Sequence, residues 1–126
     1  MELESIEFLS GDARRAGPTA PTNIGTSIAI INAEAQNSLL LLDFEYTVTY
    51  SPDGSHIRLR GKARFNTKDA KKAQADWMKA GKFSGETGEM ILNAIHYNAS
   101  ANAVLISKAF NLTAPLVLPT LKVGKA

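Results

Sequence analysis

The clearest pattern in the chain lies between Leu39 and Phe65, where apolar residues recur at every second position and most of the residues between them are polar. Every second residue from Leu40 to Tyr50 is apolar, and after Leu41 the residues between them are acidic residues and threonines. This period of two predicts a strand with one buried face. A turn at 51–55, with proline and glycine, leads into a second alternating run from Ile57 to Phe65. The two runs predict a β-hairpin.

The second run carries all of its charge on one face. Bringing the two apolar faces together in a tight turn predicts that Glu45 lies opposite Lys62 and that Asp43 lies opposite Arg64. The predicted hairpin therefore has one apolar face and one charged face. The basic side chains of that charged face are His56, Arg58, Arg60, Lys62 and Arg64.

Two more strands are predicted before the hairpin. Residues 3–9 alternate between apolar and polar, and β-forming residues dominate from Ser27 to Ala35. Between them, 17–23 contains two prolines and a glycine, which predicts an extended connection. Because the other connections are short, the sequence predicts that neighbouring strands pair in an antiparallel meander.

After Asn66 the pattern changes to that of a helix. Ala70, Ala73 and Trp77 recur on one narrow stripe, so we predict a helix over 67–80 with Trp77 in the core. Asn66 is the expected N-cap, and Gly81 stands where a helix commonly ends.

A second helical stretch is predicted from about Ser84 to near Asn111. The polar run at 98–102 predicts a kink or a break in it. An extended apolar segment, 113–119, follows because each of its two prolines disfavours a helix before it. The expected fold is thus α+β, a four-stranded antiparallel sheet followed by two helices. The expected apolar face of the second helix consists of Met90, Ile91, Ala94, Ile95, Ala101, Leu105, Ala109 and Leu112.

The composition limits the class of protein. A chain of 126 residues with 44% hydrophobic and 21% charged residues is typical of one globular domain, so we treat 1–126 as a single domain. The absence of cysteine excludes disulfides and thiolate chemistry and fits a reducing cytoplasm. No apolar run approaches the length of a membrane span, and the first residues are not those of a signal peptide. We expect a cytoplasmic protein.

The sequence contains few residues that could form a catalytic, metal-binding or cofactor-binding site. The two histidines, His56 and His96, belong to no metal-binding motif, and no nucleophile elbow, paired carboxylates or glycine-rich phosphate loop is present. We therefore predict no catalytic, metal-binding or cofactor-binding residues and no enzymatic activity. The row Arg58, Arg60, Lys62 and Arg64 offers an alternative role in nucleic-acid binding or as an adaptor. Acidic residues across the hairpin and the shortage of exposed aromatic residues make nucleic acid an unlikely partner.

The chain has more apolar faces than two helices can cover. Leu39 and Leu41 point away from the face of Leu40, and the adjacent Ile30 and Ile31 point to opposite sides. Since one helical layer covers one face of a sheet, the remaining apolar surface predicts a homo-oligomer, either a dimer or a tetramer.

Three strings resemble a known family. Trp77 is followed by Lys79-Ala80-Gly81, the second helical stretch contains Asn93-Ala94-Ile95, and residues 111–119 read Asn-Leu-Thr-Ala-Pro-Leu-Val-Leu-Pro. Together with the order of strands and helices, they resemble the SecB family of protein-export chaperones, including its archaeal relatives. The similarity spans roughly residues 39–123. The bacterial members are acidic, whereas this chain has a net charge of +2.

The resemblance implies a subunit that assembles as a dimer or a dimer of dimers and holds unfolded polypeptides along apolar grooves. We therefore predict a non-enzymatic SecB-like chaperone or polypeptide-binding module that needs no cofactor. The residues expected to bind polypeptide or to form a subunit interface, chosen by their faces, are Ile28, Ile30, Leu39, Leu41, Leu116 and Val117.

Overall fold

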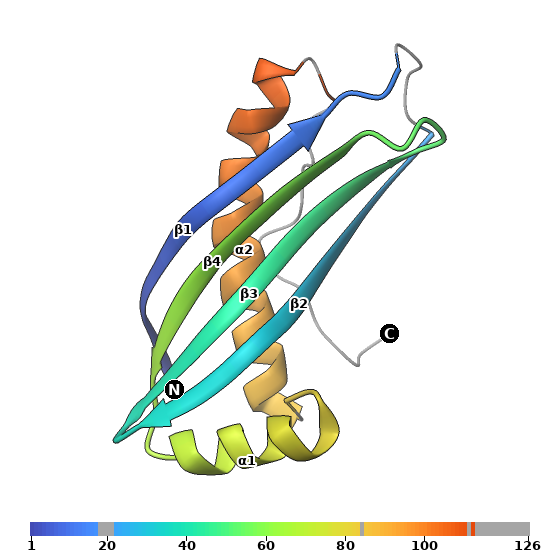
Figure 1. Ribbon diagram of the computed structural model, residues 1–126. Helices are drawn as coiled ribbons and strands as arrows, with labels where there is room; N and C mark the ends of the chain where they lie inside the picture. The colour runs from blue at the N-terminus through green and yellow to red at the C-terminus, as the bar shows by residue number, and fades with distance from the viewer. Residues whose placement is uncertain (18–21, 84, 111, 113–126) are drawn as a thin grey trace.

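The computed structural model describes residues 1–17, 22–83, 85–110 and 112. Four strands form one antiparallel sheet and two helices follow them in the chain (Figure 1), which confirms the predicted α+β fold. The strands are β1 (Glu2–Arg14), β2 (Asn23–Gln36), β3 (Leu39–Ser51) and β4 (His56–Asn66), and the helices are α1 (Ala70–Ala80) and α2 (Gly85–Ala109).

The strand order across the sheet is β1-β4-β3-β2, so the predicted meander is wrong. β1 pairs with β4, and β1 and β2 form the two edges of the sheet (Figure 1). The prediction assumed that strands next to one another in sequence also pair, which is a tendency and not a rule. Pairing with β4 also matches charges, because Glu7 lies opposite Lys62 and Asp12 lies opposite Arg58.

The β3–β4 register differs from the prediction by two residues. Asp43 lies opposite Lys62 and Glu45 lies opposite Arg60. The turn closes one residue earlier on each strand than expected, since the amide of Tyr50 donates to the carbonyl oxygen of Ser55 at 2.9 Å. A slip of two residues keeps every side chain on its face, whereas a slip of one would reverse them all. The predicted faces are therefore correct although the predicted pairs are not.

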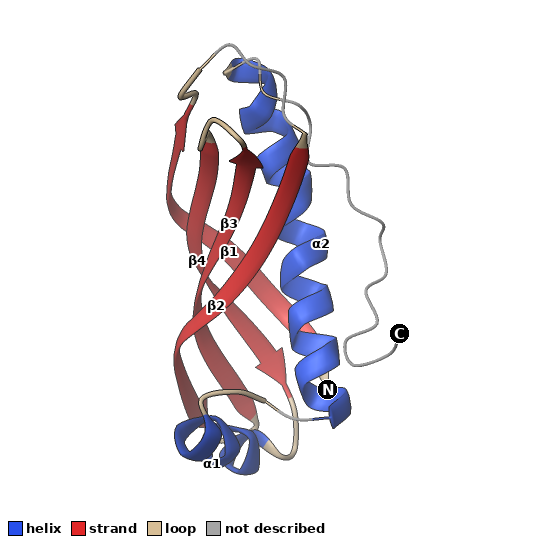
Figure 2. Cartoon of the chain, turned by 90° about the vertical axis from the view of Figure 1, so that its right-hand side faces the viewer, coloured by secondary structure: helices blue, strands red, loops and turns tan. Residues whose placement is uncertain are grey.

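α2 lies along one face of the sheet and encloses the core (Figure 2). The alternate residues of β3, from Leu40 to Tyr50, are buried against it, as predicted. We call the opposite face, which carries the basic row of β4, the outer face. In the described ranges no helix covers the outer face, since both helices pack from the other side or across one end (Figure 1).

α1 begins three residues later than predicted. Asp69 is the N-cap and makes no side-chain capping bond, while Thr67 Oγ1 accepts a hydrogen bond from the Asp69 amide at 3.2 Å. The predicted Asn66 cap is therefore wrong. The predicted end is confirmed, because Gly81 has φ 73° and its amide donates to the carbonyl oxygen of Trp77 at 2.7 Å. Trp77 itself is half-buried and packs against the core.

α1 also covers part of the β2 edge. It lies across the end of the sheet where β2 turns into β3 (Figure 1). Gln74 Oε1 accepts a hydrogen bond from the backbone amide of Ala35 at 3.0 Å. The last residues of β2 are thus protected from pairing with another strand, because a side chain already uses their outward amide.

α2 runs without interruption from Gly85 to Ala109, so the predicted break at 98–102 does not occur. The polar side chains bond back to the helix instead of breaking it: Asn98 Nδ2 donates to the Ala94 carbonyl oxygen at 2.8 Å, and Asn102 Nδ2 donates to that of Asn98 at 3.0 Å. Residues 113–119 lie outside the described ranges.

The buried face of α2 also differs from the prediction. Ala101, Leu105 and Met90 are exposed, whereas small residues occupy much of the buried face. Small side chains let the helix approach the sheet closely, which apolar periodicity alone does not indicate. The buried residues of α2 are Gly88, Ile91, Ile95, His96, Ala99, Ala103 and Ser107.

His96 gives the fold a testable pH dependence. Its ring is buried edge-to-face against Tyr46, with centroids 5.8 Å apart, and its Nε2 has no hydrogen-bond partner within the described ranges. Burial lowers the pKa of His96 below its ordinary value of 6.5. The unfolded chain therefore takes up a proton at higher pH than the folded chain does.

We expect the free energy of unfolding to fall as the pH drops below 6.5, and the His96 contribution to be constant above it. Urea titrations of the parent chain and of His96→Phe across this range measure the effect. If the free energies of unfolding of the parent chain and of His96→Phe changed with pH in parallel, the pH dependence would not come from His96.

Candidate functional site

The two edges of the sheet differ in charge. Residues 23–33 of β2 contain no charged side chain, and we call this stretch the neutral edge. β1 instead carries acidic residues along its first half and two arginines at and just beyond its end. Proteins commonly protect exposed edges with charge, so an uncharged edge of this length is open to pairing with another extended chain.

Two of the predicted polypeptide-binding residues, Ile28 and Ile30, lie in the neutral edge, whereas Leu39 and Leu41 lie opposite Gln36 and Glu34, beyond its end. Ile28 and Ile30 are half-buried and pack against the core from the helix side of β2. Leu39 and Leu41 are half-buried in the neighbouring strand β3, on the outer face. The structure therefore brings these residues to one side of the sheet but divides them between its two faces. Leu116 and Val117 lie outside the described ranges.

Ile31 is a further candidate that the sequence did not single out for binding. A β-bulge between Ile30 and Asn32 takes Ile31 out of the regular alternation, and 58% of its surface is exposed. The adjacent pair Ile30-Ile31 was the available signal, because two isoleucines in succession cannot both face the core of a regular strand. The bulge itself could not be read from the sequence.

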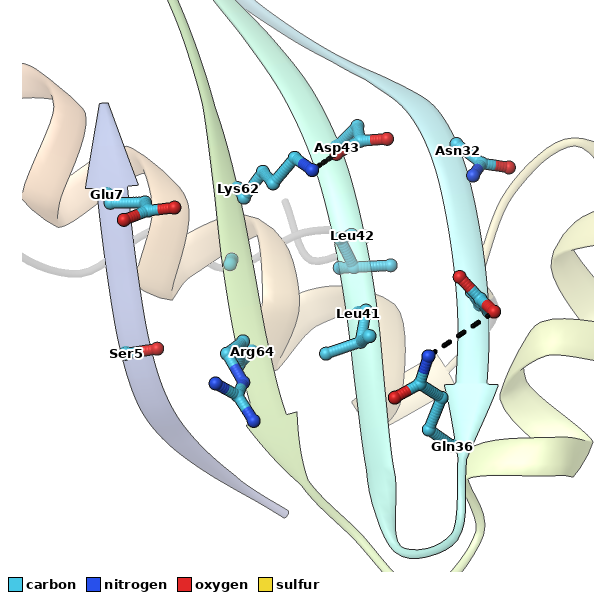
Figure 3. A pocket seen from close by; sticks show the side chains of 11 residues that line it. Ser5, Glu7, Asn32, Gln36, Leu41, Leu42, Asp43, Lys62 and Arg64 are labelled. Atoms are coloured by element: carbon cyan, nitrogen blue, oxygen red, sulfur yellow. Dashed lines mark hydrogen bonds and ion pairs between the residues drawn. The ribbon is translucent and has the colours of Figure 1, made fainter. Parts of the chain in front are cut away.

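The outer face contains a shallow hollow of about 420 Å³ (Figure 3). Leu41 is an apolar residue of its lining, Arg64 comes from β4, and Lys62 Nζ lies 4.0 Å from Asp43 Oδ1. Acidic, basic and amide side chains surround it, which suits water and polar groups better than an apolar segment. The residues that line it are Ser5, Glu7, Asn32, Glu34, Gln36, Leu41, Leu42, Asp43, Lys62, Ala63 and Arg64.

The basic row of β4 is largely neutralised. Arg60 Nε lies 2.7 Å from Glu45 Oε2, and Arg58 lies 3.6 Å from Glu45 and 4.0 Å from Asp12. Asp12 belongs to β1, which the predicted meander did not place beside β4. With acidic strands on both sides, the row offers few free cations to a phosphate backbone. The nucleic-acid alternative is therefore not favoured.

A second hollow, of about 580 Å³, lies between β1 and the C-terminal half of α2, and we call it the β1–α2 groove. Leu9, 59% exposed, stands at a bulge in β1, and Leu105, 66% exposed, faces it from α2. Phe8, Ile106 and Phe110 complete an apolar lining. Apolar surface of this kind, beside a strand edge that no other described strand covers, is typical of an interaction site.

Metal and membrane sites were also sought in the part of the chain that the structure describes. There, no group of three or more histidine, aspartate and glutamate side chains is placed to hold a metal ion. No helix in the same ranges is long and apolar enough to cross a membrane.

Comparison with solved structures identifies the fold. The chain superposes on the Mycobacterium tuberculosis Rv1957 SecB-like chaperone, solved in complex with a ChAD peptide from the Rv1956 HigA1 antitoxin, with a TM-score of 0.63. The match covers 96% of this chain and 87% of that chain at 14% sequence identity. The chain has a SecB-like fold. No protein-family model matches it, nor does any curated protein, and nothing found supports the archaeal part of the resemblance.

Proposed function

We propose that this protein is a cytoplasmic, self-associating, non-enzymatic chaperone that holds unfolded polypeptides at the neutral edge of β2. The SecB-like fold supports a chaperone or polypeptide-binding role, because the matched structure is a SecB-like chaperone with a bound peptide. The observation that carries the proposal in this chain is the neutral edge itself. It combines backbone groups that no other described strand pairs with and apolar side chains, and it has no charge that would reject a particular sequence.

An extended client would lie alongside β2 and form main-chain hydrogen bonds with it. Successive client side chains would then fall alternately on the two faces of the sheet. On one face they meet Ile28 and Ile30, and on the other they approach the outer face beside β3.

The same arrangement explains selectivity for unfolded chains. Only an unfolded chain presents a free backbone together with apolar side chains, whereas a folded protein has used both internally. The α1 helix limits the site, because Gln74 already binds the Ala35 amide at the end of β2. The proposed site is therefore the part of β2 before Glu34.

Ile31→Lys tests this proposal. Ile31 is exposed, so the change should leave the fold intact, but it places a lysine on the edge and forces a client to bury or displace a charge. We expect client affinity to fall about tenfold, equivalent to roughly 1.4 kcal/mol. The measurement is aggregation of a chemically denatured protein diluted into buffer, with each variant at the same subunit concentration.

Met78→Lys is the matched control, since it adds the same charge at a residue of α1 that is 70% exposed and lies outside residues 23–33, next to Gln74. It should suppress aggregation as the parent does. Full suppression by Ile31→Lys would show that the client binds elsewhere, and a parent protein without any effect on aggregation would overturn the chaperone role. A steep loss of binding with salt would favour phosphate binding instead.

A further inference from the structure

We propose that protonation of His96 releases the second half of α2, residues 97–109, from the sheet while the first half stays packed. The protein would then present more apolar surface in mild acid than at neutral pH. The release does not depend on the proposed chaperone role. Three features point to it: a core divided into two clusters, a buried histidine at their boundary, and a lack of charge around that histidine.

The buried core consists of two clusters that meet near the middle of α2. We call the first the α1-side cluster, because α1 contributes to it together with Ile91 and Ile95 of α2. The second, the turn-side cluster, lies toward the β3–β4 turn and receives Ala99 and Ala103 from α2. His96 therefore stands at the boundary between the two. The strand residues of the turn-side cluster are Tyr46, Val48, Tyr50, Ile57 and Leu59.

The second half of α2 is held to the sheet mainly by small side chains. Ala99 and Ala103 are its buried apolar residues, whereas Ile106 is half-buried. Its Leu105 is 66% exposed. Because burial stabilises in proportion to apolar area, two alanines hold this half less firmly than two isoleucines hold the first half. α1 lies across the other end of the sheet (Figure 1), and its buried residues belong to the α1-side cluster.

The helix also has a weak point between its two halves. Residues 98–102 are the polar run from which the sequence predicted a break, and in the folded protein Asn98 and Asn102 bond back to carbonyl oxygens of α2. Asparagine and serine favour the helix less than alanine or leucine do, because their side chains can bond the backbone in other conformations as well. Once it leaves the sheet, α2 can fray from this run onward without disturbing 85–95.

The sheet offers no charge to compensate a proton on His96. The His96 ring lies edge-to-face on Tyr46, and neither His96 Nε2 nor the Tyr46 hydroxyl has a hydrogen-bond partner within the described ranges. Tyr46 lies opposite Ile28 on one side and Leu59 on the other, and Leu59 lies opposite Gly11. This row is therefore uncharged from one edge of the described sheet to the other.

Other titratable groups near His96 are neutral or distant. Among the buried residues of the described sheet, Tyr46 and Tyr50 are titratable, and burial raises the pKa of both above the ordinary value of 10.0. Along α2, Glu89 stands about 10 Å before His96 and Lys108 about 18 Å after it. A proton on the packed His96 would thus be buried without a counter-ion, and opening removes that cost by admitting water.

The direction of the pH effect follows from the two states of His96. In the packed state burial lowers the pKa of His96 below 6.5, whereas hydration in the opened state restores the ordinary value. Well above pH 6.5 His96 is neutral in both states, so pH does not change their balance. As the pH falls below 6.5 the opened state binds the proton first, and its population rises by up to about tenfold for each pH unit.

Hydrogen exchange of individual amides tests the proposal, with rates corrected for the pH dependence of the chemical exchange step. Between about pH 7.5 and about pH 5.5, we expect protection of the amides of 101–109 to fall about fivefold or more. The amides of 89–95 should keep their protection. The emission maximum of Trp77, the single tryptophan, should not change, because Trp77 packs on the α1-side cluster.

His96→Phe should abolish the pH response, because phenylalanine is also an aromatic ring but cannot bind a proton. His56→Phe is the matched control, since it removes the other histidine, which lies on the outer face with Nε2 3.2 Å from Asp12 Oδ2. It should leave the response of α2 unchanged. If His96→Phe packs poorly, His96→Gln supplies a second neutral side chain, and its protection should likewise be independent of pH.

Equal loss of protection in both halves of α2 would show that acid opens the whole core, and it would overturn the proposal. A pH response that persists in His96→Phe and His96→Gln, or that disappears in His56→Phe, would assign the effect to another group. If the protection of 101–109 in the parent chain were the same at both pH values, His96 would not control the packing of this half. Client binding enters none of these measurements.

Discussion

Replacing Phe44 with alanine will lower the free energy of unfolding by about 4 kcal/mol. Phe44 is 1% exposed, and its ring packs edge-to-face on Phe8 with centroids 5.8 Å apart. It lies opposite Gly61, where no side chain is available to fill the space that its removal would leave. The loss combines the transfer energy of the ring with the cost of an unfilled cavity. Urea denaturation followed by circular dichroism measures it.

Thr49→Ala is the control for Phe44→Ala. Thr49 lies in the same strand, but its side chain is exposed, so the expected change is within about 0.5 kcal/mol. A loss of less than about 1 kcal/mol for Phe44→Ala would show that the core rearranges to fill the space, contrary to the packing described above.

Replacing Gly61 with valine will destabilise the fold by about 3 kcal/mol and loosen β1 from β4. A Cβ atom at this position would overlap the carbonyl oxygen of Glu7 in β1 and lie 2.9 Å from Phe44 Cζ. The obstacle in β1 is backbone, which cannot rotate away as a side chain can. Urea denaturation gives the loss of stability, and hydrogen exchange should show faster exchange of β1 amides than of β3 amides.

Gly25→Val is the matched control, because Gly25 also lies in a strand but a Cβ there meets nothing within 4 Å. Its stability should be unchanged or slightly higher, since valine favours a strand. Adding Phe44→Leu to a Gly61→Ala variant should recover little, because the overlap with Glu7 remains. Full recovery would place the main obstacle at the Phe44 ring.

The elements and their faces were predictable from the sequence because they depend on local geometry. Alternation fixed the buried face of β3, and Gly81 fixed the end of α1 through its left-handed conformation. The same alternation placed the basic row on the outer face. A period of two determines which face each side chain lies on, but it does not distinguish registers that differ by two residues. For this reason Glu45 lies opposite Arg60 and not opposite the predicted Lys62.

The candidate site was only partly predictable. Ile28, Ile30, Leu39 and Leu41 were chosen by their faces, and they do lie on β2 and β3 near one edge. That β2 is an edge of the described sheet, and that α1 contacts its end, follows from strand order and from the Gln74 contact. No residue pattern within β2 contains that information.

What the sequence determined by itself is the α+β order of elements, the apolar and charged faces, and the uncharged stretch 23–33, because each depends on residues close together in the chain. Only the tertiary structure decided that β1 pairs with β4, that Asp12 neutralises part of the basic row, and that β1 and β2 are the edges. These facts depend on contacts between distant segments, where several pairings satisfy the same local pattern and packing selects among them.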